Sequence, residues 1–235
     1  DTVLLPLFED DDVISFQKGS AYIALETEPS FDEYLFVEQS LDYTKELEKL
    51  KLKFPDKANK ITIVQQETNN FLQSWCQQKN WNMTRAVVFL DPYGMEVEWS
   101  TIECLAQTKA IDFWILFPLG QAVNRLLTKD HPPKDAWADR LNKFFGTDDW
   151  KQAFYRKKTQ RDLFEEQEIF VKEANFDSIG EYFINRLKTI FVGVAENPLP
   201  LRNSRNIPIF LLCFAASNPK GAPTAVKIAR HILGK

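Results

Sequence analysis

The chain has 235 residues, 44% of them hydrophobic, which is enough to build a core in one large domain or one domain with an insertion. A formal net charge of −4 argues against a broadly basic nucleic-acid coat, although a local basic groove is compatible with it. No apolar run is long enough to span a bilayer, no signal-peptide pattern is present, and the three cysteines form no CxxC pair, so we expect a cytoplasmic protein with reduced thiols, no membrane association and no metal site.

The first part of the chain predicts two strands, each followed by a helix. Residues 1–20 carry the acidic run Glu9 to Asp12 and are expected to be irregular and solvated, and residues 20–28 are expected to form a short helix or turn. YLFVE (34–38) and ITIVQ (61–65) are apolar and β-prone. Apolar residues at helical spacing follow each of them, over 41–52 and 70–78.

The same alternation continues through the middle of the chain. Residues 85–91 and 111–118 read as a third and a fourth strand, with a helix over 100–108 between them. Strands that alternate with helices are typical of a doubly wound parallel sheet. We therefore predict an α/β fold with a mostly parallel sheet.

Residues 129–175 break this pattern with prolines, a glycine and many charges, and short helices are expected at 134–145 and 148–156. We interpret this stretch as a helical cap inserted into a single domain of residues 1–235. A helix over 176–191 follows, then strands at 191–195 and 209–216 joined by a Pro-, Asn- and Arg-rich loop. The last helix is predicted at 222–233.

The end of the third strand is the main candidate for chemistry, because ligands of open α/β sheets bind at the carboxyl ends of the strands. It carries Asp91, Pro92, Tyr93 and Gly94. Proline leaves a neighbouring carbonyl free to accept from a ligand amine, Tyr93 can stack on a flat ring, and Gly94 allows close backbone approach. These residues suit an exocyclic amine of a base, and the competing interpretation is an ordinary strand-end turn.

Other strand ends supply polar residues with two interpretations each. Glu38 could accept hydrogen bonds from ribose hydroxyls or could cap the next helix, and Glu67 has the same ambiguity. Arg125, next to Asn124, could bind phosphate or carboxylate, or pair with a surface acid. Arg202 lies in a basic, amide-rich loop, where phosphate contact competes with a solvated turn.

Several kinds of chemistry have no residues to support them. There is no GxG sequence in the 235 residues, so no glycine-rich loop is present to hold a cofactor. Neither His131 nor His231 has an evident Ser or Cys partner for a hydrolytic triad, and the cysteines read as packing residues.

Three blocks of the sequence resemble the three-Cys-motif partner protein (TcmP) family: YLFVE, FLDPYGMEVEWSTIECLAQTKAIDFWILFPLG with Asn124-Arg125, and LRNSRN followed by PIFLLCFAASNPKG. The resemblance runs nearly end to end. It implies a Rossmann-like, class I methyltransferase fold whose last strand is antiparallel, with S-adenosylmethionine as cofactor. It also implies a partner, a three-Cys-motif protein similar to radical S-adenosylmethionine enzymes.

By this resemblance, Glu38 binds the cofactor ribose, and Gln66-Glu67 replaces the Gly-Asp pair of the family near the adenine. Residues 91–94 match the catalytic motif and are similar to the corresponding quartet of guanosine-N2 methyltransferases. The family's first strand and its glycine-rich loop have no counterpart, and we expect that they are missing from this sequence. Methyl transfer to a nucleobase amine in DNA or RNA is the preferred function, with Asn124, Arg125 and Arg202 as substrate contacts; a non-catalytic partner protein is the alternative.

Overall fold

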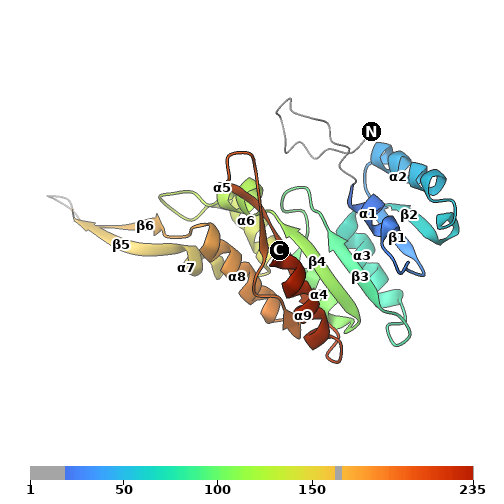
Figure 1. Ribbon diagram of the computed structural model, residues 1–235. Coiled ribbons are helices and arrows are strands. Elements are labelled where there is room, and N and C mark those ends of the chain that lie inside the picture. The colour runs from blue at the N-terminus through green and yellow to red at the C-terminus, as the bar shows by residue number, and fades with distance from the viewer. Residues whose placement is uncertain (1–18, 162–165, 235) are drawn as a thin grey trace. The chain divides into compact units, whose positions relative to one another are not determined.

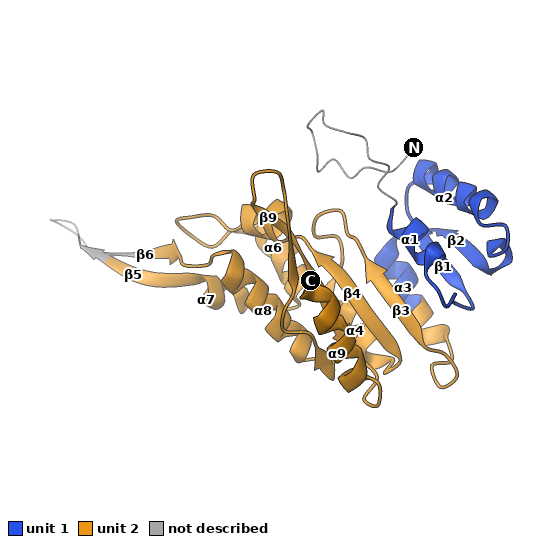
Figure 2. Cartoon of the chain, in the orientation of Figure 1, with its two compact units in different colours: residues 1–74 blue, residues 75–235 orange. Residues whose placement is uncertain are grey.

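A computed structural model describes residues 19–161 and 166–234 of the chain. The protein is a mixed α/β structure (Figure 1). It divides into two compact units, residues 1–74 and residues 75–235 (Figure 2). Residues 1–18, where the acidic irregular segment is predicted, lie outside the described residues.

Unit 1 is built around a two-stranded parallel sheet. Strands β1 and β2 pair in register from Tyr34 beside Ile61 to Glu38 beside Gln65. Buried Leu25 and Leu50 pack with Tyr34 and Ile61 to form its core. The elements of unit 1 are α1 (Ser20–Glu26), β1 (Tyr34–Glu38), α2 (Leu41–Lys53), η1 (Ala58–Lys60), β2 (Ile61–Gln65) and most of α3 (Thr68–Gln78).

A buried lysine, Lys57, links two segments of unit 1 by hydrogen bonds. Lys57 is only 7% exposed, and its amine donates to the backbone oxygen of Leu25 at 2.6 Å and to Oε1 of Glu28 at 2.9 Å. A buried ammonium needs such partners, because an unpaired charge would be costly to remove from water. The pair therefore ties η1 to the end of α1.

Unit 2 contains a five-stranded mixed sheet with the order β3-β4-β9-β7, and β8 also pairs with β9. Strands β3 and β4 are parallel, whereas β9 runs antiparallel to β4, β7 and β8. The elements of the first half of unit 2 are β3 (Ala86–Leu90), α4 (Trp99–Gln107), β4 (Ile111–Phe117), η2 (Leu119–Val123), α5 (Asn124–Leu126), α6 (Asp135–Phe145) and α7 (Trp150–Phe154). The second half holds β5 (Tyr155–Arg161), β6 (Glu166–Lys172), α8 (Phe176–Lys188), β7 (Gly193–Val194), β8 (Leu199–Arg202), β9 (Pro208–Ala216) and α9 (Ala222–Leu233).

Helices cover both faces of this sheet. On β4, alternate residues from Ile111 to Phe117 are buried. Phe117 stacks on Phe183 of α8 at 4.2 Å between ring centroids. On the other face, Ala229 and Leu233 of α9 pack with Phe214 of β9. The core of unit 2 therefore lies between α8, the sheet and α9.

The predicted strand pairing is confirmed in part. All six predicted strands exist, β1 and β2 as well as β3 and β4 are parallel, and the last strand is antiparallel. The described strands do not pair as one continuous doubly wound sheet but as three sheets, which are β1-β2, the five-stranded sheet and β5-β6.

The predicted helical cap is only half helical. Helices α6 and α7 lie where helices were expected, but residues 155–161 and 166–172 form the antiparallel strand pair β5-β6 instead (Figure 1). The charged sequence of β5 does not alternate with apolar residues, and its conformation is set by the ladder with β6, where Phe170 packs under the amine of Lys157 at 5.6 Å. Similarly, the predicted loop before β9 contains β8, which pairs with β9 with a register shift at Leu201 and Arg202.

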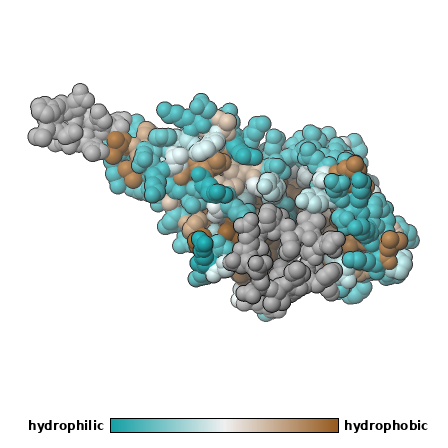
Figure 3. Space-filling model, turned by 90° about the horizontal axis from the view of Figure 1, so that it is seen from above, coloured by the Kyte–Doolittle hydropathy of each residue, from teal (hydrophilic) through white to brown (hydrophobic). Residues whose placement is uncertain are grey.

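None of the described helices is both long enough and apolar enough to cross a membrane. On the face shown in Figure 3, hydrophobic residues form scattered brown patches in a mostly hydrophilic surface.

Candidate functional site at the end of strand β3

Asp91 stands directly after the last residue of β3 and has no hydrogen-bond or ion-pair partner among the described residues. The residue as a whole is exposed, but neighbouring protein atoms partly shield its carboxyl group, and this burial raises its pKa above the usual value. A partly desolvated acid without a compensating partner is typical of functional sites.

The three residues after Asp91 form an open turn. Tyr93 is 73% exposed, so its ring is available to stack on a planar ligand. Gly94 has φ of +69°, which favours glycine, and nothing lies within 4 Å of the position that a Cβ would take. The turn is held from behind by Met95 and Val97, which are 5% and 4% exposed. Anchored apolar residues thus present the predicted quartet to solvent.

The segment after the end of β4 packs closely against its neighbours. Gly120 lies against β9, and a Cβ there would approach the backbone oxygen of Pro208 to 2.4 Å. The side-chain oxygen of Asn124 accepts from Nζ of Lys172 at 2.8 Å, and the same amine donates to the backbone oxygen of Leu127 at 3.2 Å. Burial lowers the pKa of Lys172. Asn124 therefore joins α5 to β6, whereas the neighbouring Arg125 is exposed.

Arg202 closes its own loop. Its Nη1 donates to the backbone oxygen of Asn206 at 2.9 Å, and the side-chain oxygen of Asn203 accepts from the backbone N–H groups of Arg205 and Ile207. The loop therefore satisfies these donors and acceptors with its own residues. The remaining donors of Arg202 are exposed to solvent.

The strand directions place these unit 2 residues at the same end of the sheet, where β3 and β4 finish. Strand β4 is parallel to β3 and antiparallel to β9, which is antiparallel to β8. The quartet after β3, the Asn124-Arg125 pair after β4 and Arg202 at the end of β8 therefore share the same edge. Arg202 lies three strand positions from Asp91, a separation of about 14 Å at the usual strand spacing.

The predicted cofactor residues lie in unit 1, where Glu38 and Glu67 bond to the backbone at the starts of α2 and α3. Oε1 of Glu38 accepts from the backbone N–H of Ser40 at 2.7 Å, at the start of α2. Both oxygens of Glu67 accept backbone bonds at the start of α3, from Asn69 and from Asn70, each at 2.8 Å. For Glu67, burial raises the pKa, but the bonds from Asn70 and Asn69 outweigh it and the pKa is lowered.

These contacts leave Glu38 with more capacity than Glu67 to accept hydrogen bonds from a ligand. Oε2 of Glu38 has no partner among the described residues, so it can still accept from a hydroxyl group. Both oxygens of Glu67 already accept backbone hydrogen bonds. The backbone N–H of Gln66 donates to the backbone oxygen of Glu38 at 3.1 Å.

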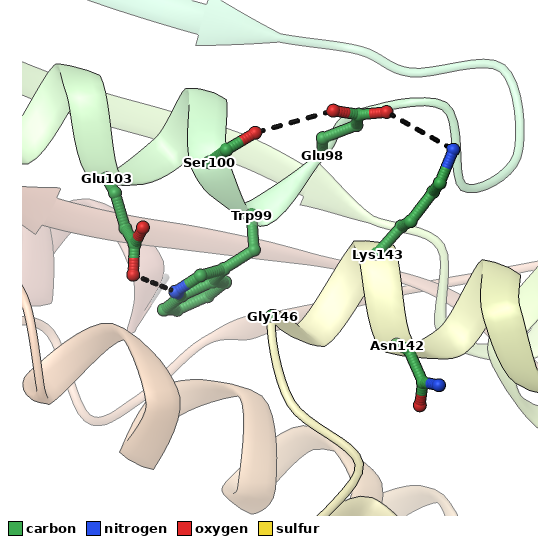
Figure 4. Close-up of a pocket in the computed structure, with 7 residues that line it drawn as sticks. All are labelled: Glu98, Trp99, Ser100, Glu103, Asn142, Lys143 and Gly146. Atoms are coloured by element: carbon green, nitrogen blue, oxygen red, sulfur yellow. Dashed lines mark hydrogen bonds and ion pairs between the residues drawn. The ribbon is translucent and has the colours of Figure 1, made fainter.

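A further group, around Trp99, was missed by sequence reasoning. The indole N–H of Trp99 donates to Oε1 of Glu103 at 2.8 Å, and the guanidinium of Arg186 lies 4.5 Å from the ring centroid. Gly146, with φ of +69°, ends α6 against this ring. An open pocket of about 390 Å³ lies beside Trp99 (Figure 4). The residues that line it are Glu98, Trp99, Ser100, Glu103, Asn142, Lys143 and Gly146.

Charged side chains, Glu98, Glu103 and Lys143, are among the residues that line this pocket. Figure 4 shows Glu98 between Ser100 and Lys143, with its carboxylate 3.8 Å from the lysine amine. A glycine after a helical pattern was visible in the sequence, but nothing local links it to a tryptophan 47 positions earlier. The pairing depends on tertiary packing.

Other titratable groups do not form a second reactive cluster. Burial raises the pKa of Cys76 to about 12 and also raises that of Cys104, so both thiols are protonated and poorly nucleophilic at neutral pH. Cys213 is fully buried. Within residues 19–161 and 166–234, no group of three or more His, Cys, Asp or Glu side chains is arranged to hold a metal ion.

Comparison with known proteins adds no relative from which a role could be taken: no family model matches the chain, and no curated protein matches it significantly.

Proposed function

We propose that the protein is an S-adenosylmethionine-dependent methyltransferase that acts on an exocyclic amine of a nucleobase. The observation that carries this proposal is the unpartnered, partly buried carboxyl group of Asp91 at the carboxyl end of β3, followed by Pro92 and an exposed Tyr93. A nucleobase amine needs an acceptor for its N–H groups and a flat surface for its ring. These residues offer both.

In this proposal Asp91 accepts a hydrogen bond from the target amine. The carboxylate stabilises the positive charge that develops on the nitrogen as its bond to the methyl carbon forms, and it can accept the proton that the nitrogen then loses. The backbone oxygen before or at Pro92 can accept the second N–H, since proline itself donates none. Tyr93 stacks on the base, which must leave a duplex to reach this edge of the sheet.

S-adenosylmethionine would supply the electrophilic methyl group. Of the cofactor residues expected from the resemblance, Glu38 fits, because one carboxylate oxygen remains able to accept from a ribose hydroxyl. Glu67 is less available, because both of its oxygens already accept backbone hydrogen bonds at the start of α3. The proposal also requires a glycine-rich loop, which residues 1–235 do not encode.

Calorimetry with S-adenosylmethionine and S-adenosylhomocysteine tests the proposal directly. We expect binding that Glu38→Gln weakens about tenfold, the scale of one lost charge-assisted hydrogen bond. Asp91→Asn should leave cofactor binding intact and abolish methyl transfer to oligonucleotides, whereas Asp139→Asn, an exposed acid on α6, should change neither. Absence of binding to either compound by a chain that includes a glycine-rich loop would reject the enzyme.

A non-catalytic partner protein is the second candidate. The observation that favours it is that Glu38 and Glu67 both bond to the backbone at the start of the following helix, which gives each predicted cofactor acid a structural task. By the resemblance, its partner would be a three-Cys-motif protein similar to radical S-adenosylmethionine enzymes. Binding of such a protein that is unaffected by Asp91→Asn, with no cofactor binding, would support this candidate over the enzyme.

A further inference from the structure

The β8-β9 loop, residues 203–207, is held in shape by its own hydrogen bonds. The side-chain oxygen of Asn203 accepts from the backbone N–H groups of Arg205 at 3.1 Å and of Ile207 at 3.0 Å. Asn206 has φ of +58°, a conformation that asparagine tolerates better than most residues, and its backbone oxygen accepts from Nη1 of Arg202 at 2.9 Å. The loop is therefore ordered before any ligand binds.

The two residues at the tip of this loop keep hydrogen-bond donors for a ligand. Ser204 and Arg205 are both exposed. Neither the hydroxyl nor the backbone N–H of Ser204 has a partner among residues 19–161 and 166–234, and the guanidinium of Arg205 has none there either. A guanidinium beside a hydroxyl and an N–H group suits the oxygens of a phosphate, which the planar fork of arginine binds in a bidentate manner.

The positive charge of this loop is not balanced by acids. In the described part of the chain neither Arg202 nor Arg205 forms an ion pair. Cations elsewhere in unit 2 do so: Glu196 pairs with Lys188 at 2.6 Å and with Arg230 at 3.4 Å. The whole chain has a net charge of −4. Two arginines without acidic partners in an acidic chain indicate a surface that meets negative charge.

The loop lies at the end of the sheet that carries the candidate site. β8 ends and β9 begins where β3 and β4 finish. A Cβ at Gly120 of η2 would lie 2.4 Å from the backbone oxygen of Pro208, the first residue of β9, so the base of the loop packs against η2. η2 continues directly into α5, which carries Arg125. The loop and Arg125 therefore border the same part of unit 2.

We propose that Ser204 and Arg205 bind a backbone phosphate of a nucleic-acid strand, beside the contacts of Arg125 and Arg202. This inference rests on the proposed function and narrows its substrate. The target base belongs to a polynucleotide, because a free base or nucleoside has no phosphate to reach the loop. Since the loop is already ordered, its donors need not be arranged when the strand binds, and this lowers the cost of binding.

Fluorescence anisotropy with a single-stranded oligonucleotide, on the full chain at several salt concentrations, tests the contact. Arg205→Ala should weaken binding about tenfold at low salt and lower the logarithmic salt slope by about 0.7, the value for one phosphate contact on a single strand. Lys220→Ala, an exposed change in the turn before α9, removes the same charge and should alter neither quantity.

Two further variants separate charge from hydrogen bonding. Arg205→Lys keeps the charge and should restore the salt slope, while the affinity stays several-fold lower because an ammonium group lacks the planar fork. Ser204→Ala removes a neutral donor, so it should weaken binding about threefold and leave the slope unchanged.

An oligonucleotide of the same sequence with uncharged methylphosphonate linkages tests the identity of the ligand group. Arg205→Ala should not weaken binding to it, and equal weakening with both oligonucleotides would overturn the phosphate contact. Unchanged affinity and slope in Arg205→Ala with the ordinary oligonucleotide would overturn this inference alone. A wild-type chain that binds S-adenosylmethionine but no oligonucleotide would overturn the nucleic-acid substrate together with the loop. Oligonucleotide binding that depends on Arg205, without cofactor binding, would reject the enzyme and support the loop.

Discussion

Gly146 makes room for Trp99 in a way that no other residue type allows. A Cβ at this position would lie 2.1 Å from Cδ1 of Trp99, and the backbone φ of +69° is itself unfavourable for a side chain. Trp99 cannot easily move, because Glu103 holds its indole N–H and Arg186 covers its ring. Any side chain at position 146 would therefore add both a steric clash with Trp99 and an unfavourable backbone conformation.

We expect Gly146→Ala to lower the free energy of unfolding by roughly 3 kcal/mol, the sum of backbone strain and overpacking. Gly94→Ala is the matched control: its φ is also +69°, but its added Cβ meets nothing within 4 Å. It should cost only about 1 kcal/mol. Urea denaturation measures both, and equal losses would show that the contact with Trp99 is relieved at little cost.

The raised pKa of Asp91 has a consequence for stability. Burial lifts the pKa in the folded state above its value in the unfolded chain, so the folded state binds the proton more tightly. Its contribution to stability is then lost as the pH rises through the folded pKa, and above that pKa the carboxylate is a net cost. Asp91→Asn removes the ionised form.

The variant Asp91→Asn should therefore be more stable than the wild type at pH 7, with the difference disappearing below the ordinary pKa of an aspartate. Urea denaturation at neutral and acidic pH measures this difference. Asp139→Asn should show no such dependence. A variant less stable than the wild type at pH 7 would mean that the folded state stabilises the carboxylate.

Strands and helices with strong local patterns could be predicted from the sequence. β1 and β2 were placed at their observed bounds because both are short, apolar and bounded by polar residues. β5 could not be recognised, since its charged sequence has no apolar alternation and its partner is several residues downstream. β8 contains Pro200, which argues against a strand but is tolerated at an edge.

In the candidate site, too, local sequence patterns predicted some features and tertiary contacts decided the others. The position of Asp91 at a carboxyl edge followed from one strand-to-helix pattern. The roles of Glu38 and Glu67 did not, because a helix cap and a ribose ligand use the same residue type at the same place, and only hydrogen-bond partners separate them.

A serine joins the ends of two central strands. Ser217 is 2% exposed, and its Oγ accepts from the backbone N–H of Ile111 at 2.8 Å, at the start of β4 and the end of β9. Ser217→Ala would leave that buried N–H without a partner. We expect a loss of about 2 kcal/mol in the free energy of unfolding, measured by urea denaturation. Ser204→Ala, in the exposed loop before β9, should cost almost nothing.

At the scale of the whole molecule, the net charge of −4 confines any nucleic-acid contact to a local cationic edge. Arg125 and Arg202 are two exposed arginines that the topology brings to the end of the sheet carrying Asp91. Their contribution would be electrostatic and therefore sensitive to salt.

We expect binding to a single-stranded oligonucleotide to weaken with salt. The double substitution R125A/R202A should lower the logarithmic salt slope by about 1.4, close to two phosphate contacts on a single strand. Fluorescence anisotropy at several salt concentrations gives the slope. Lys220→Ala with Lys227→Ala, which removes equal charge at α9, should leave it nearly unchanged; equal effects of the two pairs would indicate a response to net charge alone.

Lys172 joins β6 to the segment that carries Arg125. Its backbone N–H donates to the backbone oxygen of Lys129, and its amine donates to Asn124 and Leu127. Arg125 lies in the sequence between the two residues that bind this amine. The backbone on both sides of this exposed arginine is therefore fixed by one lysine that lies 47 residues further along the chain.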